Sequence, residues 1–190
     1  MTQPEQLGID NALANALTQR ASVSSLAGLI LSATGQSRPP VDLSRIVKLW
    51  PGLTVTVEDL DGEGYMVELG GRSGEILVKR ATMRTRRRFT LAHELGHWTL
   101  ALWKEGMANM SRAQVEKWCD EFATELLIPR SWLAASLESS GRSLASVVSE
   151  LPAVYQVSNQ PMWIQCSHQG LLSLAIAGRS LDASFTPTAP

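Results

Sequence analysis

Cysteine is scarce in this sequence of 190 residues, and the two cysteines that are present lie far apart. Cys119 and Cys166 form neither the C-x-x-C spacing of a zinc knuckle nor the dense pattern of a disulfide-stabilised secreted domain. The spacing therefore predicts two free thiols in a reducing compartment.

Long apolar runs and an excess of positive charge are also missing. The longest apolar stretch near the N-terminus, residues 23–33, is about half of a membrane span and is interrupted by serine and glycine. No lysine or arginine precedes it within residues 1–19, unlike in a signal peptide. The 17 basic residues are offset by 18 acidic ones, so no overall field attracts nucleic acid or an anionic membrane. We therefore expect a cytoplasmic protein with no membrane contact and no direct nucleic-acid binding.

The fold class follows from changes in the apolar spacing. Hydrophobic residues make up 44% of the chain, which is enough for one ordinary core at this length. Three alternating runs separated by glycine-rich turns predict a small antiparallel sheet of three strands, at residues 53–57, 65–69 and 76–78. Helical spacing predicts helices at residues 22–34, 42–50, 86–103, 112–128, 131–137 and 143–151. The sequence thus predicts an α+β fold.

The two ends of the chain are expected to differ from the middle. Residues 1–21 have few apolar positions, which predicts either a loose helix or a mobile N-terminal extension. We expect residues 22–140 to form the main domain and residues 141–182 to pack on it as a C-terminal helical extension. Residues 183–190 are expected to be a flexible tail.

One motif carries clear chemistry. His93, Glu94 and His97 form H-E-x-x-H in a proline-free segment of good helix formers. At 3.6 residues per turn the two histidines lie on one face, where their imidazoles can bind one zinc ion at about 2.0 to 2.1 Å. Glu94 is rotated by about 100° from His93, so it can act as general base on metal-bound water without binding the metal. The plainer alternative is a surface helix with two solvated histidines.

A catalytic zinc site needs three protein ligands and an open position for water. Only His168 remains among the 3 histidines, so a carboxylate from the next helix is the better candidate. An S-x-x-Q capping box at residues 111–114 predicts where that helix starts. The helix offers four acidic residues, Glu116, Asp120, Glu121 and Glu125.

Angular position separates these four carboxylates. Glu116 and Asp120 lie beside the apolar stripe of the helix, on a side that we expect to be buried, whereas Glu121 and Glu125 lie on the other flank. We therefore assign Glu116 as the third metal ligand. Asp120 is assigned as an outer acceptor that holds a histidine N–H and fixes its tautomer, with a solvated helix surface at even odds.

Three weaker features leave alternatives open. His168 could stabilise the transition-state oxyanion, but a structural role is favoured. The basic run at residues 84–88 is either a solvated face or a docking surface for an acidic partner. Residues 157–164 faintly suggest a helix-turn-helix element, although ordinary helix packing is favoured.

The sequence resembles the ImmA/IrrE family of zinc metallopeptidases. Two runs carry the resemblance, R-F-T-x-A-H-E-L-G-H at residues 88–97 and E-x-x-C-D-x-F-A-x-x-L-L-x-P at residues 116–129. P-P-V-D-L at residues 39–43 adds weaker support, and the similarity spans roughly residues 22–140. Cys119 stands where the family usually has alanine, and a small thiol fits the same packing slot.

The resemblance implies more than the residues alone. It implies a zincin-like fold in which a small sheet packs on the metal helix and a substrate strand adds to the sheet edge. It supports Glu116 over Glu121 as ligand, and zinc as the metal, with manganese as the alternative. It also implies an endopeptidase that cuts a helix-turn-helix repressor of a mobile element or stress response. The competing hypothesis is a non-catalytic metal-binding module that binds a repressor or DNA.

Overall fold

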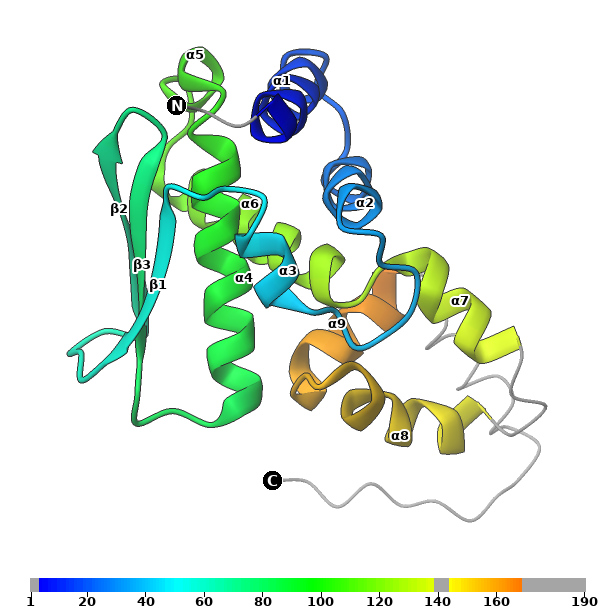
Figure 1. Cartoon of the computed structure of the whole chain (residues 1–190). Helices are drawn as coiled ribbons and strands as arrows, with labels where there is room; N and C mark the ends of the chain where they lie inside the picture. Colours follow the sequence, from blue (N-terminus) through cyan, green and yellow to red (C-terminus); the bar gives the residue numbers. More distant parts are fainter. Residues whose placement is uncertain (1–3, 139–143, 169–190) are drawn as a thin grey trace.

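A computed structural model describes residues 4–138 and 144–168 (Figure 1). A three-stranded sheet lies at one side of the molecule and helix α4 packs along it (Figure 1). Helix α5 lies past one end of α4, and most of the other helices lie on the side of α4 away from the sheet (Figure 1). The strands are β1 (Leu53–Glu58), β2 (Gly64–Gly70) and β3 (Ser73–Lys79). The helices are α1 (Pro4–Thr18), α2 (Val23–Ala33), α3 (Leu43–Val47), α4 (Arg84–Leu100), α5 (Lys104–Met107), α6 (Arg112–Leu127), α7 (Arg130–Glu138), α8 (Leu144–Tyr155) and α9 (Asn159–His168).

The sheet is mixed, which corrects the predicted antiparallel arrangement. Its strand order is β1-β3-β2, with β2 antiparallel and β1 parallel to β3. Alternation of apolar residues gives the same signal for either strand direction, so the sequence pattern could not settle this point. The predicted α+β class and the three strands are confirmed.

The position of β3 in the middle of the sheet follows from its side chains. Ile76 and Val78 are buried on the face that packs on α4, and every second residue of β3 is buried. The turn from β2 to β3 places Gly70, Gly71 and Arg72 at positive φ values of 87°, 58° and 59°. This tight turn makes β2 and β3 a hairpin, and β2 becomes an edge strand.

Helices α4 and α6 form the centre of the core. Leu95 and Trp98 from α4 and Phe122 and Leu126 from α6 are fully buried between the sheet and α2. The predicted capping box starts α6: the Gln114 N–H donates to the Ser111 hydroxyl over 3.3 Å, and the Ser111 N–H donates to the Gln114 side chain over 2.7 Å. The predicted helix at residues 86–103 instead runs from Arg84 to Leu100.

The N-terminal segment takes the helical alternative of the prediction. Ile9, Leu13 and Leu17 recur every four residues along α1, and all three are buried. Helix α1 contacts α2, and its Asp10 is also buried. The predicted division into domains stays a prediction, and the predicted tail at residues 183–190 lies outside the described residues.

A charged cluster joins α1 to the far end of the sheet. Arg72 donates from Nε and Nη2 to the two carboxylate oxygens of Asp10, over 2.9 and 2.7 Å. Its guanidinium lies 4.3 Å from the ring centroid of Trp98, and Trp50 Nε1 donates to Asp10 over 2.7 Å. One pair of opposite charges therefore connects α1, the hairpin turn and α4.

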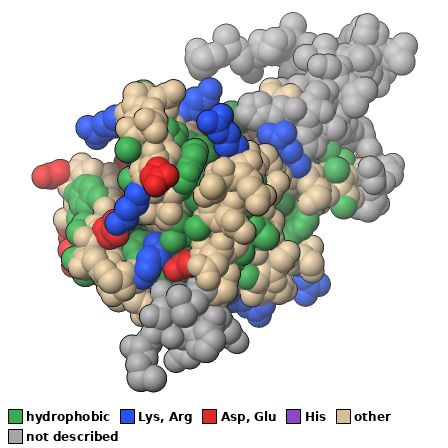
Figure 2. All heavy atoms as spheres, turned by 90° about the horizontal axis from the view of Figure 1, so that it is seen from above, with side chains coloured by type: hydrophobic (Ala, Val, Ile, Leu, Met, Phe, Trp, Pro, Cys, Tyr) green, Lys and Arg blue, Asp and Glu red, His purple; other side chains and the backbone are tan. Residues whose placement is uncertain are grey.

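On the face shown in Figure 2, acidic and basic side chains are interspersed and form no continuous basic patch in the visible described part. Within residues 4–138 and 144–168, no helix combines the length and apolar character needed to cross a membrane.

The Asp10 pair gives a stability prediction. Arg72→Ala should lower the free energy of unfolding by about 2 to 3 kcal/mol, because it leaves a buried carboxylate without its main partner. Arg45→Ala is the control, since the Arg45–Asp42 pair is exposed and should contribute less than about 1 kcal/mol. Chemical denaturation of the two variants measures both values, and equal losses would contradict the role given to Arg72.

Candidate metal centre

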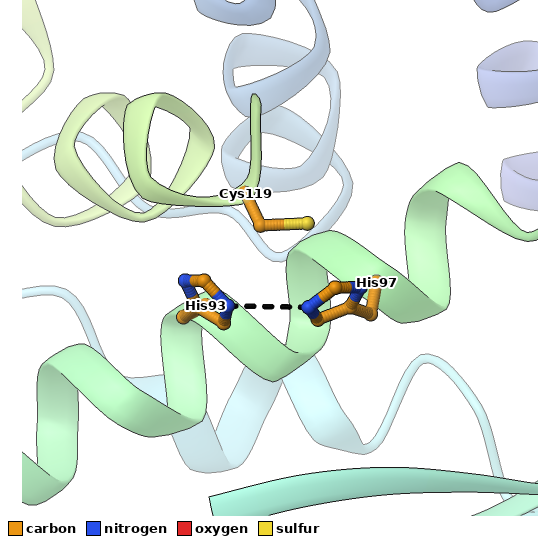
Figure 3. Close-up of side chains that lie close together, drawn as sticks. All are labelled: His93, His97 and Cys119. Atoms are coloured by element: carbon orange, nitrogen blue, oxygen red, sulfur yellow. Dashed lines mark hydrogen bonds between the residues drawn. The ribbon is translucent and has the colours of Figure 1, made fainter. Parts of the chain in front are cut away.

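Helix α4 brings the two predicted histidines together. His93 and His97 are one turn apart, and their Nε2 atoms lie 3.2 Å from each other. The ring planes are inclined by 65°. The two nitrogens face each other on the same side of the helix (Figure 3). Both side chains are largely buried.

Helix α6 adds the predicted carboxylate. Glu116 Oε2 lies 3.3 Å from His93 Nε2 and 3.9 Å from His97 Nε2. Three ligands bound tetrahedrally to zinc at about 2.0 to 2.1 Å lie about 3.3 Å from one another. The observed separations of 3.2, 3.3 and 3.9 Å are close to that value.

Asp120 contacts the first histidine from its other side. His93 Nδ1 lies 2.9 Å from Asp120 Oδ1, a distance that suits donation of the ring N–H to the carboxylate. With the proton on Nδ1, the lone pair of His93 is at Nε2 and faces Glu116 Oε2. Two electron pairs at 3.3 Å repel each other unless a cation lies between them, so this donor set fits a metal ion.

Glu94 lies deeper than the other acidic residues of the site. Its side chain is buried beside β2, and the Met66 backbone N–H donates a hydrogen bond to it. Burial raises the pKa of Glu94 from 4.5 to about 6; the Glu116 carboxylate also raises it, and His93 lowers it. A carboxylate with a pKa close to neutrality is suited to accept and release a proton.

The same environment keeps His97 neutral. Burial lowers the pKa of His97, and the neighbouring His93 ring lowers it further, although Glu116 and Asp120 act in the opposite direction. A neutral imidazole is the form that binds metal.

Burial on α6 differs from the sequence prediction. Glu116 and Asp120 were expected on a buried side, but 46% and 60% of their side-chain surfaces are exposed. Glu125, assigned to the other flank, is buried and accepts a hydrogen bond from Arg130. All three side chains border the cleft, but Glu125 lies on the part of α6 that is next to α2 and to Arg130, at the start of α7.

From its sequence position, Cys119 was expected only to fill a packing slot, but in the structure it also lies next to the two histidines. Its Sγ and one ring nitrogen each of His93 and His97 all lie within 4.8 Å of one another. Burial raises the pKa of the Cys119 thiol, as do the nearby carboxylates of Glu116, Glu94 and Asp120. The signal in the sequence was its position three residues after Glu116, on the same helix face.

His93, Glu94, His97, Glu116 and Asp120 line a cleft of about 1370 Å³. The first residues of β2 lie along one wall, α4 and α6 form the floor, and α9 contributes Pro161, Ile164 and Gln165 to the other wall. The edge strand β2 borders this cleft.

The remaining predicted residues have different positions. Arg88 of the basic run is a structural residue, because its guanidinium donates to the Gln156 and Val41 carbonyls over 3.1 and 2.8 Å. Arg86 lies 3.4 Å from Glu63 at the cleft. His168 is the last residue of α9, and its side chain lies outside what the structure describes.

Comparison with known proteins adds a family and a fold. A peptidase family model described as the IrrE N-terminal-like domain matches residues 52–161. No curated protein sequence matches this chain. Among solved structures, a Mycobacterium tuberculosis transcriptional regulator is similar in fold, with a TM-score of 0.54 and 14% sequence identity. The similarity covers 84% of this chain but only 51% of the regulator chain.

Glu94 makes the stability of the metal-free protein depend on pH. Its folded pKa of about 6 exceeds the ordinary value of 4.5, so its neutral form favours folding below pH 4.5. That contribution is lost as the pH rises through about 6, for a total of about 2 kcal/mol. The parent chain should lose this contribution between pH 4 and pH 8, and Glu94→Gln should not. The free energy of unfolding of the variant minus that of the parent should therefore rise by about 2 kcal/mol over this range. Denaturant unfolding with chelator measures this difference, and a constant difference would contradict it.

Proposed function

Because the chain belongs to the IrrE N-terminal-like family of peptidases, we propose that it is a zinc-dependent endopeptidase whose metal is held by His93, His97 and Glu116. The observation that carries the proposal is the convergence of one oxygen and two nitrogens at 3.2 to 3.9 Å. Zinc is the favoured metal because two imidazoles and one carboxylate are its usual catalytic ligand set, with manganese as the alternative.

Glu94 is the proposed general base. Bound zinc would supply Lewis acidity, which lowers the pKa of water and polarises the scissile carbonyl. The Glu94 carboxylate takes the proton from the attacking water and passes it to the leaving amine. Its burial and its pKa of about 6 support this role, because a base must release its proton in the same cycle.

Asp120 is the proposed positioning residue. By accepting the His93 Nδ1–H at 2.9 Å it keeps the Nε2 lone pair directed at the metal position. The exposure of Asp120 is compatible with this role, because the hydrogen bond to the ring, and not burial, defines the tautomer.

The proposed substrate is a protein segment, in particular one from a helix-turn-helix repressor of a mobile element or stress response. An extended chain can pair with the edge strand β2 and enter the cleft between β2 and α9. The similarity to a protein described as a transcriptional regulator agrees with a regulatory role, although that likeness concerns the fold alone.

The second candidate function is a metal-bearing module that binds a repressor or DNA without cutting it. The α8–α9 pair has the order of a helix-turn-helix element, but α9 contains no lysine or arginine that could contact phosphates. Helix α9 also contacts α6 and buries Met162 and Cys166, as ordinary packing requires. Direct DNA binding is therefore the weaker form of this alternative, and a buried base beside the metal position favours catalysis.

Replacement of Glu94 separates these two functions. Glu94→Gln should lower the cleavage rate by about 10² to 10⁴-fold and leave the zinc content unchanged, because the amide cannot accept the proton. Glu121→Gln is the control, since Glu121 also lines the cleft but pairs with Lys117 at 3.8 Å. The assay incubates each variant with a helix-turn-helix repressor that the parent chain cleaves, with and without chelator, and identifies fragments by mass. Cleavage by Glu94→Gln at the normal rate would remove the base assignment.

The role of Asp120 is tested by metal affinity. Asp120→Ala should weaken zinc binding by about 10 to 100-fold, because His93 loses the partner that orients its ring. Glu121→Ala removes the adjacent carboxylate, which pairs with Lys117, and should change the affinity less than twofold. Competition with a zinc-binding dye gives the zinc dissociation constants of both variants. Equal affinities would show that Asp120 does not orient His93.

A further inference from the structure

We propose that Cys119 is a fourth protein ligand, so that the resting site is closed by two imidazoles, one carboxylate and one thiolate. This proposal rests on the proposed metal site and adds a form in which the water position is occupied by sulfur. In that form the centre has the coordination of a structural zinc site, and catalysis requires the sulfur to leave.

The geometry supports the proposal. The Cys119 side chain faces the two histidine rings, with its sulfur on the His97 side (Figure 3). Sulfur and nitrogen ligands of one tetrahedral zinc ion lie about 3.6 Å apart, for bond lengths of about 2.3 and 2.0 Å. The observed upper limit of 4.8 Å exceeds that separation by about 1.2 Å. A change between staggered rotamers about the Cα–Cβ bond displaces a cysteine sulfur by more than this difference while the backbone stays in place.

Packing alone does not account for the sulfur. A β-carbon at Gly96 would lie 3.2 Å from the α-carbon and 3.3 Å from the β-carbon of Cys119, so the two helices require a small residue at both positions. An alanine side chain would satisfy that requirement on α6. The sulfur extends beyond this contact, toward the imidazoles (Figure 3).

Coordination by Cys119 exchanges the thiol proton for a bond between sulfur and metal. The Cys119 S–H bond breaks, its proton passes to solvent, and the sulfur forms a bond to the metal with no change in oxidation state. When the site opens, a water molecule replaces the sulfur and the thiol regains a proton. Because a thiolate is a soft ligand, the closed form should also favour soft cations such as cadmium over zinc.

Cobalt substitution tests the proposal directly. Cobalt(II) bound to the full chain should show a sulfur-to-cobalt charge-transfer band in the near ultraviolet, because only a thiolate ligand produces it. Cys119→Ala and Cys119→Ser should bind one cobalt per chain without the band. Cys166→Ala removes the other thiol and should keep it. A cobalt-loaded parent chain without the band would overturn the proposal, as would a band that persists in Cys119→Ala.

Metal content separates this failure from failure of the proposed function. A parent chain that binds no zinc or cobalt in native mass spectrometry refutes both proposals. One cobalt per chain without the band refutes the thiolate alone and leaves the peptidase proposal intact. The ratio of cadmium to zinc affinity gives a second measurement: it should fall by about tenfold or more in Cys119→Ala, and an unchanged ratio would count against the sulfur ligand.

Discussion

The close approach of α4 and α6 is the constraint on which the rest of the structure depends. Gly96 allows the backbone of one helix to lie against Cys119 of the other, with no room for a side chain between them. Only at that separation can the His93 ring and the Glu116 carboxylate, from different helices, come within 3.3 Å. The close helix contact thus positions the site, and the fully buried side chains around it hold the two helices in place.

The low polarity around this contact explains why neighbouring acidic groups differ. Glu94 points toward β2 and is buried, so its pKa is raised, whereas the Glu116 and Asp120 side chains border the cleft and are partly exposed. Three carboxylates near two imidazoles would repel one another without positive charge nearby. The proposed dication would supply that charge, next to one buried carboxyl group whose pKa is raised.

Much of the site could be predicted from local spacing, because helix geometry relates positions one turn apart. His93, Glu94 and His97 follow from such spacing, and so does the capping box that sets the rotation of Glu116 on α6. The direction of β1 did not follow, since alternation is the same in parallel and antiparallel strands. Nor did the burial of Glu125 or the neighbourhood of Cys119, because both depend on which elements border the cleft. Tertiary contacts of this kind leave no periodic signal in the sequence.

Arg88 connects α4 to two segments that lie far from it in the sequence. Its half-buried guanidinium joins α4 to the carbonyl of Val41, just before α3, and to that of Gln156, in the turn between α8 and α9. The wall of the cleft that α9 provides is therefore connected to the first turns of the helix that carries both histidines. Outward movement of that wall would have to stretch or break the hydrogen bond to Gln156, or move α4 with it.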